Sequence, residues 1–520
     1  MCGITIRPSI HGTESKIAYR GPDVTQVKQV EDYTFIFHRL AIIDRSHAGD
    51  QPFEDKRWVL VCNGEIFNYK SLKQTYTDYP FISHSDCETI IPVLENHRLV
   101  EACNMLDGEF AFVAYDKRHK RIIAARDAMG IRPLFYGYTK TENKISFSSE
   151  MKDLIDYCEK VYPFPPGHYY NGEDIRPFSE LYRLPGGKNY DMDKILINIR
   201  NILTASVVKR LDADVPIGYL LSGGLDSSLV CSIAQRHTVK PITTFAIGLD
   251  YNPIDLKYAK QVADYLGTDH YEVIFTKQDI KDILKTIVWH TETWDVTTIR
   301  ASTPMFLLCK YIRENTDIRV VLSGEVSDEL FGYKYTDYAP TAIEFQKESQ
   351  KRIKELYMYD VLRADRSIAG NSLEARVPFS DTQFVRYVME IEPEIKLNTY
   401  NMGKYLLRKA FDGAGYLPNE ILYRDKAAFS DAVGHGLVDC LIELADELYT
   451  DAEFSEKVVK YTENRPLTKE GLMYREMFNE MYPNQDDVIC GYWLPNRSWP
   501  NCDLDDPSAR HLPNYGASGE

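Results

Sequence analysis

Residues 222–228 read Ser-Gly-Gly-Leu-Asp-Ser-Ser, and they follow directly on an apolar run at 217–221. Two glycines allow a sharp turn and a close approach of the backbone to an anion. The serine hydroxyls can donate to phosphate oxygens, and a helix expected to start near Leu225 directs its N-terminus at them. Asp226 adds a carboxylate of the kind that binds Mg²⁺. The stretch therefore predicts a site that holds the pyrophosphate of ATP.

This loop differs from the Walker A loop, because the string Gly-x-x-x-x-Gly-Lys-Ser/Thr occurs nowhere in the chain. Transfer of a γ-phosphate is therefore disfavoured. The plainer alternative is a Ser/Gly turn between a strand and a helix, which is common in α/β proteins. The flanking sequence argues against that alternative.

Downstream of the loop, strand-like and helix-like segments alternate, which is the pattern of a parallel sheet. We expect strands at 243–247, 270–275 and 319–322, and a helix at 255–266. In an open α/β sheet the ligand binds beyond the carboxyl ends of the strands. The loops that follow these strands are therefore predicted to face one nucleotide.

A second polar loop, Ser323-Gly324-Glu325, follows the strand at 319–322, and Asp328 lies just beyond it. Asp328 would share a metal with Asp226 through the phosphate oxygens of ATP. Ordinary surface charge is the alternative for these acids.

The N-terminus reads Met1-Cys2-Gly3-Ile4. Trimming of Met1 would leave a cysteine whose own α-amine lies beside its thiol. With a pKa near 8, that amine can act as a general base for the sulfur at neutral pH. The alternative is a buried small hydrophobic residue that happens to be second.

Polar strings follow within the first 90 residues: Arg20-Gly21-Pro22-Asp23, His38-Arg39-Leu40, Asn63-Gly64-Glu65 and Ser85-Asp86-Cys87-Glu88. With these strings the chain resembles the glutamine-dependent asparagine synthetases of the N-terminal-cysteine amidotransferase type. The resemblance runs from Cys2 to about Pro483. It also includes Gly130-Ile131-Arg132-Pro133-Leu134, Ser148-Ser149-Glu150-Met151-Lys152, Thr297-Thr298-Ile299-Arg300-Ala301-Ser302 and Glu374-Ala375-Arg376-Val377-Pro378-Phe379.

The domain organisation combines this resemblance with the change of pattern along the chain. Short alternating strands in the first part, such as 57–62 and 110–116, suit a sandwich of two antiparallel sheets, and helical periodicity dominates from Asp193 onward. We expect an α/β protein with a four-layer αββα glutaminase domain at 1–189 and a parallel-sheet ATP-pyrophosphatase domain at 190–483. An extended tail at 484–520 should lay its aromatic residues on the body of the protein.

The resemblance implies roles for the residues of the first domain. Cys2 attacks the carboxamide of glutamine, and the oxyanion is held by the Asn63 amide and the Gly64 N–H. Arg39 grips the α-carboxylate of glutamine, and Glu65 and Asp86 accept from its ammonium group. The whole set implied for glutamine binding is Arg39, Leu40, Ala41, Ile42, Ile43, Asn63, Gly64, Glu65 and Asp86.

In the second domain, the resemblance implies that aspartate attacks the α-phosphorus of ATP and that ammonia then displaces AMP to form asparagine. Glu325 is implied in forming the acyl-adenylate. Asp226 and Asp328 would hold Mg²⁺, and Thr297, Thr298 and Arg300 would contact aspartate. The implied ATP-binding residues are Leu220, Ser222, Gly223, Gly224, Leu225, Asp226, Ser227, Ile247, Ser323, Gly324 and Lys426.

Three features depart from the family pattern. The segment between Cys2 and Arg20 is short, which leaves little room for a helix. Val326 stands where a glycine is typical, so either the loop does not need a positive φ or its conformation is altered. Glu109 replaces a position that is often apolar near the ammonia route, and a carboxylate there would hold ammonium or water.

The composition limits the classes of binding partner and the cellular compartment that we expect. The net charge of −16, from 61 basic and 77 acidic side chains, argues against binding of nucleic acid or of anionic membranes. Ten cysteines without a Cys-x-x-Cys pair, and a reactive Cys2, favour a reducing compartment, so a cytoplasmic enzyme is expected. ATP and Mg²⁺ are the expected cofactors; aspartate, glutamine and ATP are the expected partners, and a homodimer is left open.

Two alternative functions stay open on the sequence. One is a related amide ligase with the same scaffold, such as a β-lactam-forming synthetase, which lacks a working Cys2 glutaminase. The other is a catalytically impaired relative that binds nucleotide without releasing pyrophosphate.

Overall fold

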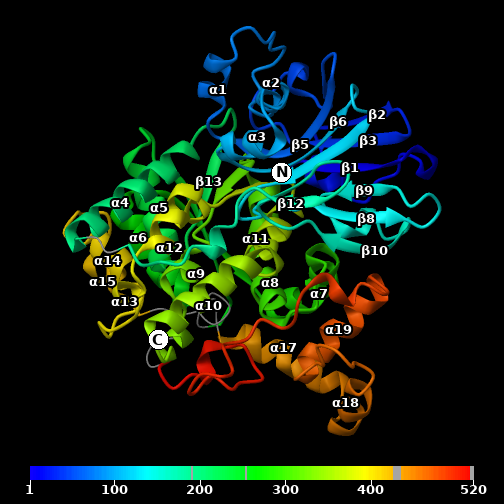
Figure 1. Ribbon diagram of the computed structural model, residues 1–520. Coiled ribbons are helices and arrows are strands. Elements are labelled where there is room, and N and C mark those ends of the chain that lie inside the picture. Colours follow the sequence, from blue (N-terminus) through cyan, green and yellow to red (C-terminus); the bar gives the residue numbers. More distant parts are fainter. Residues whose placement is uncertain (189–190, 252–253, 426–434, 516–520) are drawn as a thin grey trace.

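The computed structural model describes residues 1–188, 191–251, 254–425 and 435–515, and Figure 1 shows its N-terminal half above its C-terminal half. In the described residues, the first half contains two six-stranded antiparallel sheets and the second a five-stranded parallel sheet. The predicted α/β class, with antiparallel sheets first and a parallel sheet second, is confirmed. The predicted boundary at 189/190 falls on residues outside the described ranges and stays a prediction.

The two antiparallel sheets pack face to face. The first has the order β10 (Cys158–Pro163), β8 (Phe135–Thr139), β9 (Ile145–Ser148), β1 (Gly3–Pro8), β3 (Tyr33–Arg39), β2 (Val24–Val30). The second has the order β12 (Ile175–Pro177), β11 (His168–Tyr170), β7 (Arg121–Arg126), β6 (Gly108–Asp116), β5 (Trp58–Ile66), β4 (Phe53–Glu54). Ile4 and Phe37 of the first sheet share a hydrophobic core with Val61 of the second.

Helices cover the outer faces of this sandwich. On the second sheet lie α1 (Tyr69–Thr75), α2 (Ile90–Asn96) and α3 (Leu99–Met105), whose apolar residues pack with Leu60 and Phe112. Residues 9–20 form only two short 3₁₀ turns, η1 (Ser9–His11) and η2 (Ala18–Arg20), as the short segment led us to expect. The helices that pack with Phe135 and Val161 of the first sheet come instead from the second half of the chain. The fourth layer of the sandwich is therefore supplied by the other domain.

The parallel sheet has the order β15 (Asp269–Phe275), β14 (Thr243–Leu249), β13 (Ile217–Leu220), β16 (Val320–Leu322), β17 (Glu374–Arg376). The three predicted strands are confirmed to within two residues. Along β14, Phe245 and Ile247 join one hydrophobic core whereas Ala246 joins another, because successive side chains of a strand point to opposite faces. Both faces of this sheet are therefore buried.

Helices lie on both faces. One core contains residues of α4 (Met192–Lys209), α5 (Leu225–Arg236), α6 (Ile254–Leu266), α12 (Thr382–Glu390) and α14 (Tyr405–Phe411). The other contains residues of α7 (Lys277–Thr291), α8 (Val296–Asn315), α11 (Asp360–Ala369), α17 (His435–Leu448) and α19 (Lys469–Met481). The second half also contains α9 (Ser327–Phe331), α10 (Ala342–Glu355), α13 (Pro393–Lys396), α15 (Asn419–Leu422) and α18 (Asp451–Val458). Within the described ranges, no helix has the length and apolar character needed to cross a membrane.

A buried network of charged side chains joins the two halves. It consists of three cations and three anions, each side chain at most 3% exposed: Arg20, Lys152 and Arg366 with Glu150, Glu292 and Asp365. Glu150 contacts all three cations, and its carboxylate lies 2.6 Å from Arg20 and 3.0 Å from Arg366. We call this set the interdomain charge network.

The C-terminal segment at 484–515 has little regular structure but lies against the body of the protein. Trp493 and Trp499 are buried, and the ring of Tyr492 packs edge-on against Trp294 at 4.6 Å. The prediction that the tail aromatics rest on the body is confirmed. The tail thereby reaches the large cavity of the second half.

Candidate active site

Cys2 lies at the start of β1, inside the N-terminal sandwich. Its thiol is partly exposed and lies 3.7 Å from the carbonyl oxygen of Leu40. Burial raises the pKa of this thiol to about 11, so the sulfur is protonated at neutral pH and needs a base when it attacks. Burial also lowers the pKa of the Met1 amine to about 5. The amine predicted to act as the base is a different one, the α-amine that Cys2 would carry after Met1 is trimmed.

Asn63 and Gly64 lie side by side on β5, next to β6. Asn63 is fully buried, yet neither its Oδ1 nor its Nδ2 has a hydrogen-bond partner in the described part of the protein. A buried amide without partners is costly, and such groups often await a ligand. A side chain on Gly64 would lie 2.3 Å from the carbonyl oxygen of Glu109, so only glycine fits. This pair has the character of an oxyanion hole.

Arg39 ends β3, and its guanidinium is already well held. It pairs with Asp50 at 2.6 Å and donates to the carbonyl oxygens of Ser46 and Asp44. The side chain is therefore fixed in place, and any glutamine carboxylate would share it with Asp50. The segment that follows, residues 40–43, lies where the two halves meet, because the Asp214 N–H donates to the Ile42 carbonyl oxygen.

Glu65 and Asp86 are two buried acids of the same site. Burial raises the pKa of both carboxyls. The charges of Asp86 and Glu374 raise the pKa of Glu65 further, and the charge of Glu374 raises the pKa of Asp86 further. The carboxylate of Glu65 lies 3.0 Å from Arg376 of β17, while Asp86 accepts from the Ile66 N–H at 2.7 Å. An ammonium group placed between these acids would relieve their repulsion.

Glu109 is buried but not isolated. Its carboxylate lies 2.8 Å from Arg210 and 3.2 Å from Arg132, and it accepts from the Val377 N–H. Two guanidinium groups therefore neutralise this acid. That arrangement weakens its predicted tendency to hold an ammonium ion.

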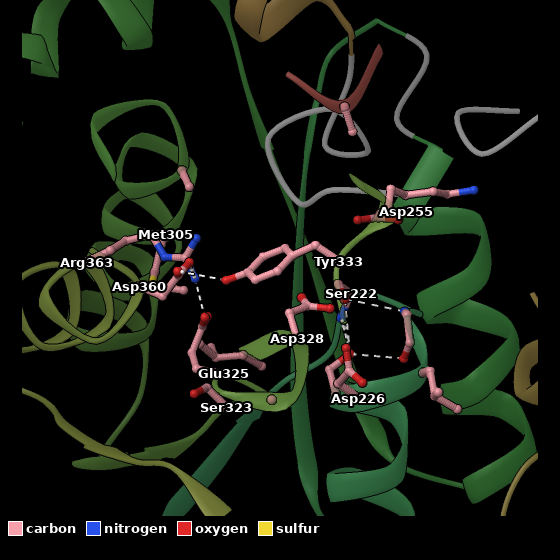
Figure 2. A pocket seen from close by; sticks show the side chains of 18 of the residues that line it. Ser222, Asp226, Asp255, Met305, Ser323, Glu325, Asp328, Tyr333, Asp360 and Arg363 are labelled. Carbon is pink, nitrogen blue, oxygen red and sulfur yellow. Dashed lines mark hydrogen bonds and ion pairs between the residues drawn. The ribbon is translucent and has the colours of Figure 1, made fainter. Parts of the chain in front are cut away.

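The two predicted nucleotide loops open onto one cavity of about 250 Å³ in the second half. Figure 2 shows Asp328 between Glu325 on one side and Asp226 on the other. The predicted residues that line this cavity are Leu220, Ser222, Gly224, Leu225, Asp226, Ser227, Ile247, Thr297, Arg300, Ser323, Gly324, Glu325 and Asp328. The loops after β13, β14 and β16 thus converge, as the parallel sheet requires.

Both loops need glycine at particular places. Gly223 has φ +72°, and a side chain there would strike the backbone of Tyr258 and Ala259. A side chain on Gly324 would lie 2.7 Å from the backbone nitrogen of Ser227, so the second loop touches the first directly. Val326 has φ 78°, which shows that the loop keeps a left-handed residue and that a β-branched side chain occupies it. Such a residue stores about 1–3 kcal/mol of strain.

At one end of the cavity the predicted Glu325 lies with two acids that the sequence reasoning missed, Glu329 and Asp360. Glu325 pairs with Arg363, which also lies 3.3 Å from Asp360. The Tyr333 hydroxyl lies 2.9 Å from Glu329 and 3.2 Å from Asp360, an arrangement visible in part in Figure 2. Burial raises the pKa of the Glu325 carboxyl against the effect of Arg363. Asp360 and Arg363 come from α11, so no motif near Glu325 in the sequence predicts that they lie beside it.

The predicted aspartate contacts divide into two kinds. Thr297 and Arg300 line the cavity, whereas the Thr298 hydroxyl donates to Asp295 at 2.8 Å and points elsewhere. Arg300 is held by Glu470 at 2.5 Å and by Asp506 of the C-terminal segment at 2.7 Å. In the described residues these acids use four of the five N–H groups of Arg300. A substrate carboxylate would therefore meet an arginine whose charge is largely balanced.

The two predicted metal ligands converge on one cation of the protein. Lys404, which precedes α14, lies 2.6 Å from Asp226 and 2.7 Å from Asp328. Both carboxylates already contact a cation of the protein, and the binding of Mg²⁺ by this pair stays a prediction. Arg408 and Arg424 also line the cavity, and sequence reasoning missed all three. The predicted Lys426 lies outside the described residues.

Comparisons of the sequence with known proteins show the family to which the chain belongs. A family model for a glutamine amidotransferase domain matches residues 1–183, and one for asparagine synthase matches residues 198–343 and 338–509. Asparagine synthetase [glutamine-hydrolyzing] 3 of Arabidopsis thaliana is 44% identical over 90% of this chain and 83% of its own. A probable glutamine-hydrolysing asparagine synthetase of Schizosaccharomyces pombe is 39% identical over the full length of both chains. A solved glutamine phosphoribosylpyrophosphate amidotransferase of B. subtilis is 15% identical, covers 52% of this chain and 65% of its own, and superposes with a TM-score of 0.28.

A sandwich carrying an N-terminal cysteine, joined to a parallel-sheet domain with a nucleotide cavity, defines an enzyme that couples glutamine hydrolysis to an ATP-dependent synthase. At 39–44% identity over nine tenths or more of its length, the chain belongs to the family of glutamine-hydrolysing asparagine synthetases.

Proposed function

We propose that this protein converts aspartate to asparagine through a β-aspartyl-AMP intermediate, with ammonia that Cys2 releases from glutamine. The convergence of both nucleotide loops and Glu325 on one cavity is the observation that carries the proposal. Glutamate, AMP and pyrophosphate are then the other products.

In the first half, the Cys2 sulfur attacks the carboxamide carbon of glutamine while the neighbouring amine takes up the thiol proton. The unpartnered Asn63 amide and the Gly64 N–H receive the oxyanion. Arg39 binds the α-carboxylate, and the paired acids Glu65 and Asp86 bind the α-ammonium group. Water then hydrolyses the thioester and regenerates the thiol.

In the second half, the Ser222–Ser228 loop holds the phosphates of ATP and the loop at Ser323 contacts the nucleoside. Asp226 and Asp328 would hold Mg²⁺, which neutralises phosphate charge when it is bound. Arg363 fixes the orientation of Glu325 at the end of the cavity where the acyl-adenylate forms.

The cytosol is the proposed location, because Cys2 must stay reduced to act as a nucleophile. All ten cysteines are free thiols in this structure, and eight of them are buried.

An assay with Mg-ATP, aspartate and glutamine tests the function directly, with asparagine, AMP and glutamate measured together. Equal amounts of asparagine and AMP are expected. A related amide ligase would give AMP without asparagine or without use of glutamine, and an impaired relative would bind ATP without releasing pyrophosphate.

Gly324→Ala should lower asparagine formation at least tenfold, because the added methyl group meets the backbone of the first nucleotide loop at 2.7 Å. Release of glutamate from glutamine should continue. Gly403→Ala is the control, since a side chain there meets nothing within 4 Å. Equal asparagine rates in the two variants would show that the loops do not need their close contact.

Asp506→Ala should lower asparagine formation about tenfold and change the KM for aspartate more than the KM for ATP. The substitution frees one side of Arg300 and loosens the tail at the cavity. Asp505→Ala is the matched control, because its carboxylate is 61% exposed and pairs only weakly with Arg497 at the surface. An unchanged KM for aspartate in Asp506→Ala would separate the tail from the aspartate site.

A further inference from the structure

Lys404 stands out because its ammonium group is buried between the two acids expected to hold a metal. Its side chain is 3% exposed, and Nζ lies 2.6 Å from Asp226, 2.7 Å from Asp328 and 3.1 Å from the Ser327 hydroxyl. The two acids belong to different loops, and Lys404 comes from a third segment. Three separate parts of the chain therefore build this contact.

The position of the ammonium is the position that a divalent cation would need. A metal bound by both carboxylates must lie within about 2–2.6 Å of their oxygens, so it cannot share the space with Nζ. Like charges this close repel strongly inside a protein. Free Mg²⁺ and the lysine therefore compete for the same two acids.

Two other cations that line the cavity, Arg408 and Arg424, donate to backbone carbonyl oxygens. Arg408 donates to the carbonyl oxygens of Gly403 and Leu422, and Arg424 donates to that of Gly223 and pairs with Asp255. Lys404 differs because its four-carbon stem is flexible and its partners are carboxylates beside the phosphate loop. Phosphate oxygens bound at that loop would offer the ammonium new partners close by.

We propose that Lys404 is a resident counter-ion that keeps the two-carboxylate site closed to free Mg²⁺ and releases it when phosphates enter. This inference rests on the proposed role of the cavity in binding ATP. It predicts an order of binding: the metal enters together with the nucleotide and not before it. The site would then take up Mg²⁺ only when ATP is present to use it.

Binding of Mn²⁺ to the ligand-free protein tests the proposal, with free Mn²⁺ followed by electron paramagnetic resonance. Lys404→Gln should bind Mn²⁺ at least tenfold more tightly than the original protein when no nucleotide is present. Lys404→Arg keeps the charge and should stay weak. Lys409→Gln is the matched control, because Lys409 lies on α14, which begins directly after Lys404, but pairs with Asp412 at the surface.

A non-hydrolysable ATP analogue completes the experiment. It should tighten Mn²⁺ binding at least tenfold in the original protein and much less in Lys404→Gln. Equal Mn²⁺ affinity in the original protein and in Lys404→Gln, without nucleotide, would overturn the proposal.

A thermal melt shows whether Lys404→Gln is still folded. If Lys404→Gln is destabilised, added Mg²⁺ should raise its melting temperature more than that of the original protein, because ligands stabilise the state that binds them. A melt that Mg²⁺ does not shift in the variant would count against the proposal. The outcome is independent of asparagine formation, so failure of the overall reaction would be recognised separately.

Discussion

Cys2→Ala is expected to lower glutamine-dependent asparagine formation by at least about a thousandfold, because the sulfur proposed to attack the carboxamide is removed. Ammonium-dependent asparagine formation should stay within about twofold of the original rate, since the nucleotide cavity lies in the other half of the chain. The two rates are measured with aspartate and Mg-ATP, once with glutamine and once with ammonium chloride.

Cys490→Ala serves as the matched control, because Cys490 is an exposed thiol far from β1 in the sequence. It should keep both activities. Continued release of glutamate by Cys2→Ala would show that another group hydrolyses glutamine and would contradict the assignment.

Glu150→Gln should destabilise the protein by about 3–5 kcal/mol, the usual cost of breaking a buried ion pair by removing one partner. Glu150 contacts all three cations of the interdomain charge network, and its loss leaves a net positive charge out of reach of water. Thermal unfolding and domain-specific proteolysis measure the effect. Glu54→Gln, on a partly exposed carboxylate that pairs with Lys28 and Lys117, should change stability by less than about 1 kcal/mol.

The same network has a defined pH dependence. Burial alone would raise the pKa of Glu150, but Arg366, Lys152 and Arg20 hold it well below its ordinary value. A carboxyl with a lowered pKa stabilises the folded state above its unfolded pKa, and this stabilisation is lost as the pH falls through the folded pKa. The difference between the original protein and Glu150→Gln should therefore persist from pH 7 down to mild acid and shrink only in strong acid. A difference that vanishes near pH 6 would contradict this account.

Local patterns predicted the strands of the parallel sheet well, because β13, β14 and β16 are apolar and β15 ends in the apolar residues 273–275. The strand β17 was not predicted, since three residues at 374–376 are too short to show a period. Its place beside β16 is set by long-range packing. The packing of second-half residues against the first sheet is likewise a tertiary effect that no window of sequence contains.

The active site likewise contains residues that the sequence predicted and residues that it did not. Residues in loops that follow a strand, such as Ser222, Asp226 and Ser323, were placed correctly at the cavity because strand direction fixes where such loops lie. Lys404 and Arg363 were missed, because Lys404 reaches the cavity from the start of α14 and Arg363 from α11, and neither segment carries a nucleotide-binding pattern. The engagement of Arg300 by Asp506 was missed because the acid comes from the tail, more than 200 residues away.

The position of the tail at the cavity affects the order in which the two sites form during synthesis of the chain. Residues 493–512 complete the cavity wall, and they leave the ribosome after every other segment that lines it. A nascent chain can therefore assemble the sandwich around Cys2 while the acceptor site still lacks one side.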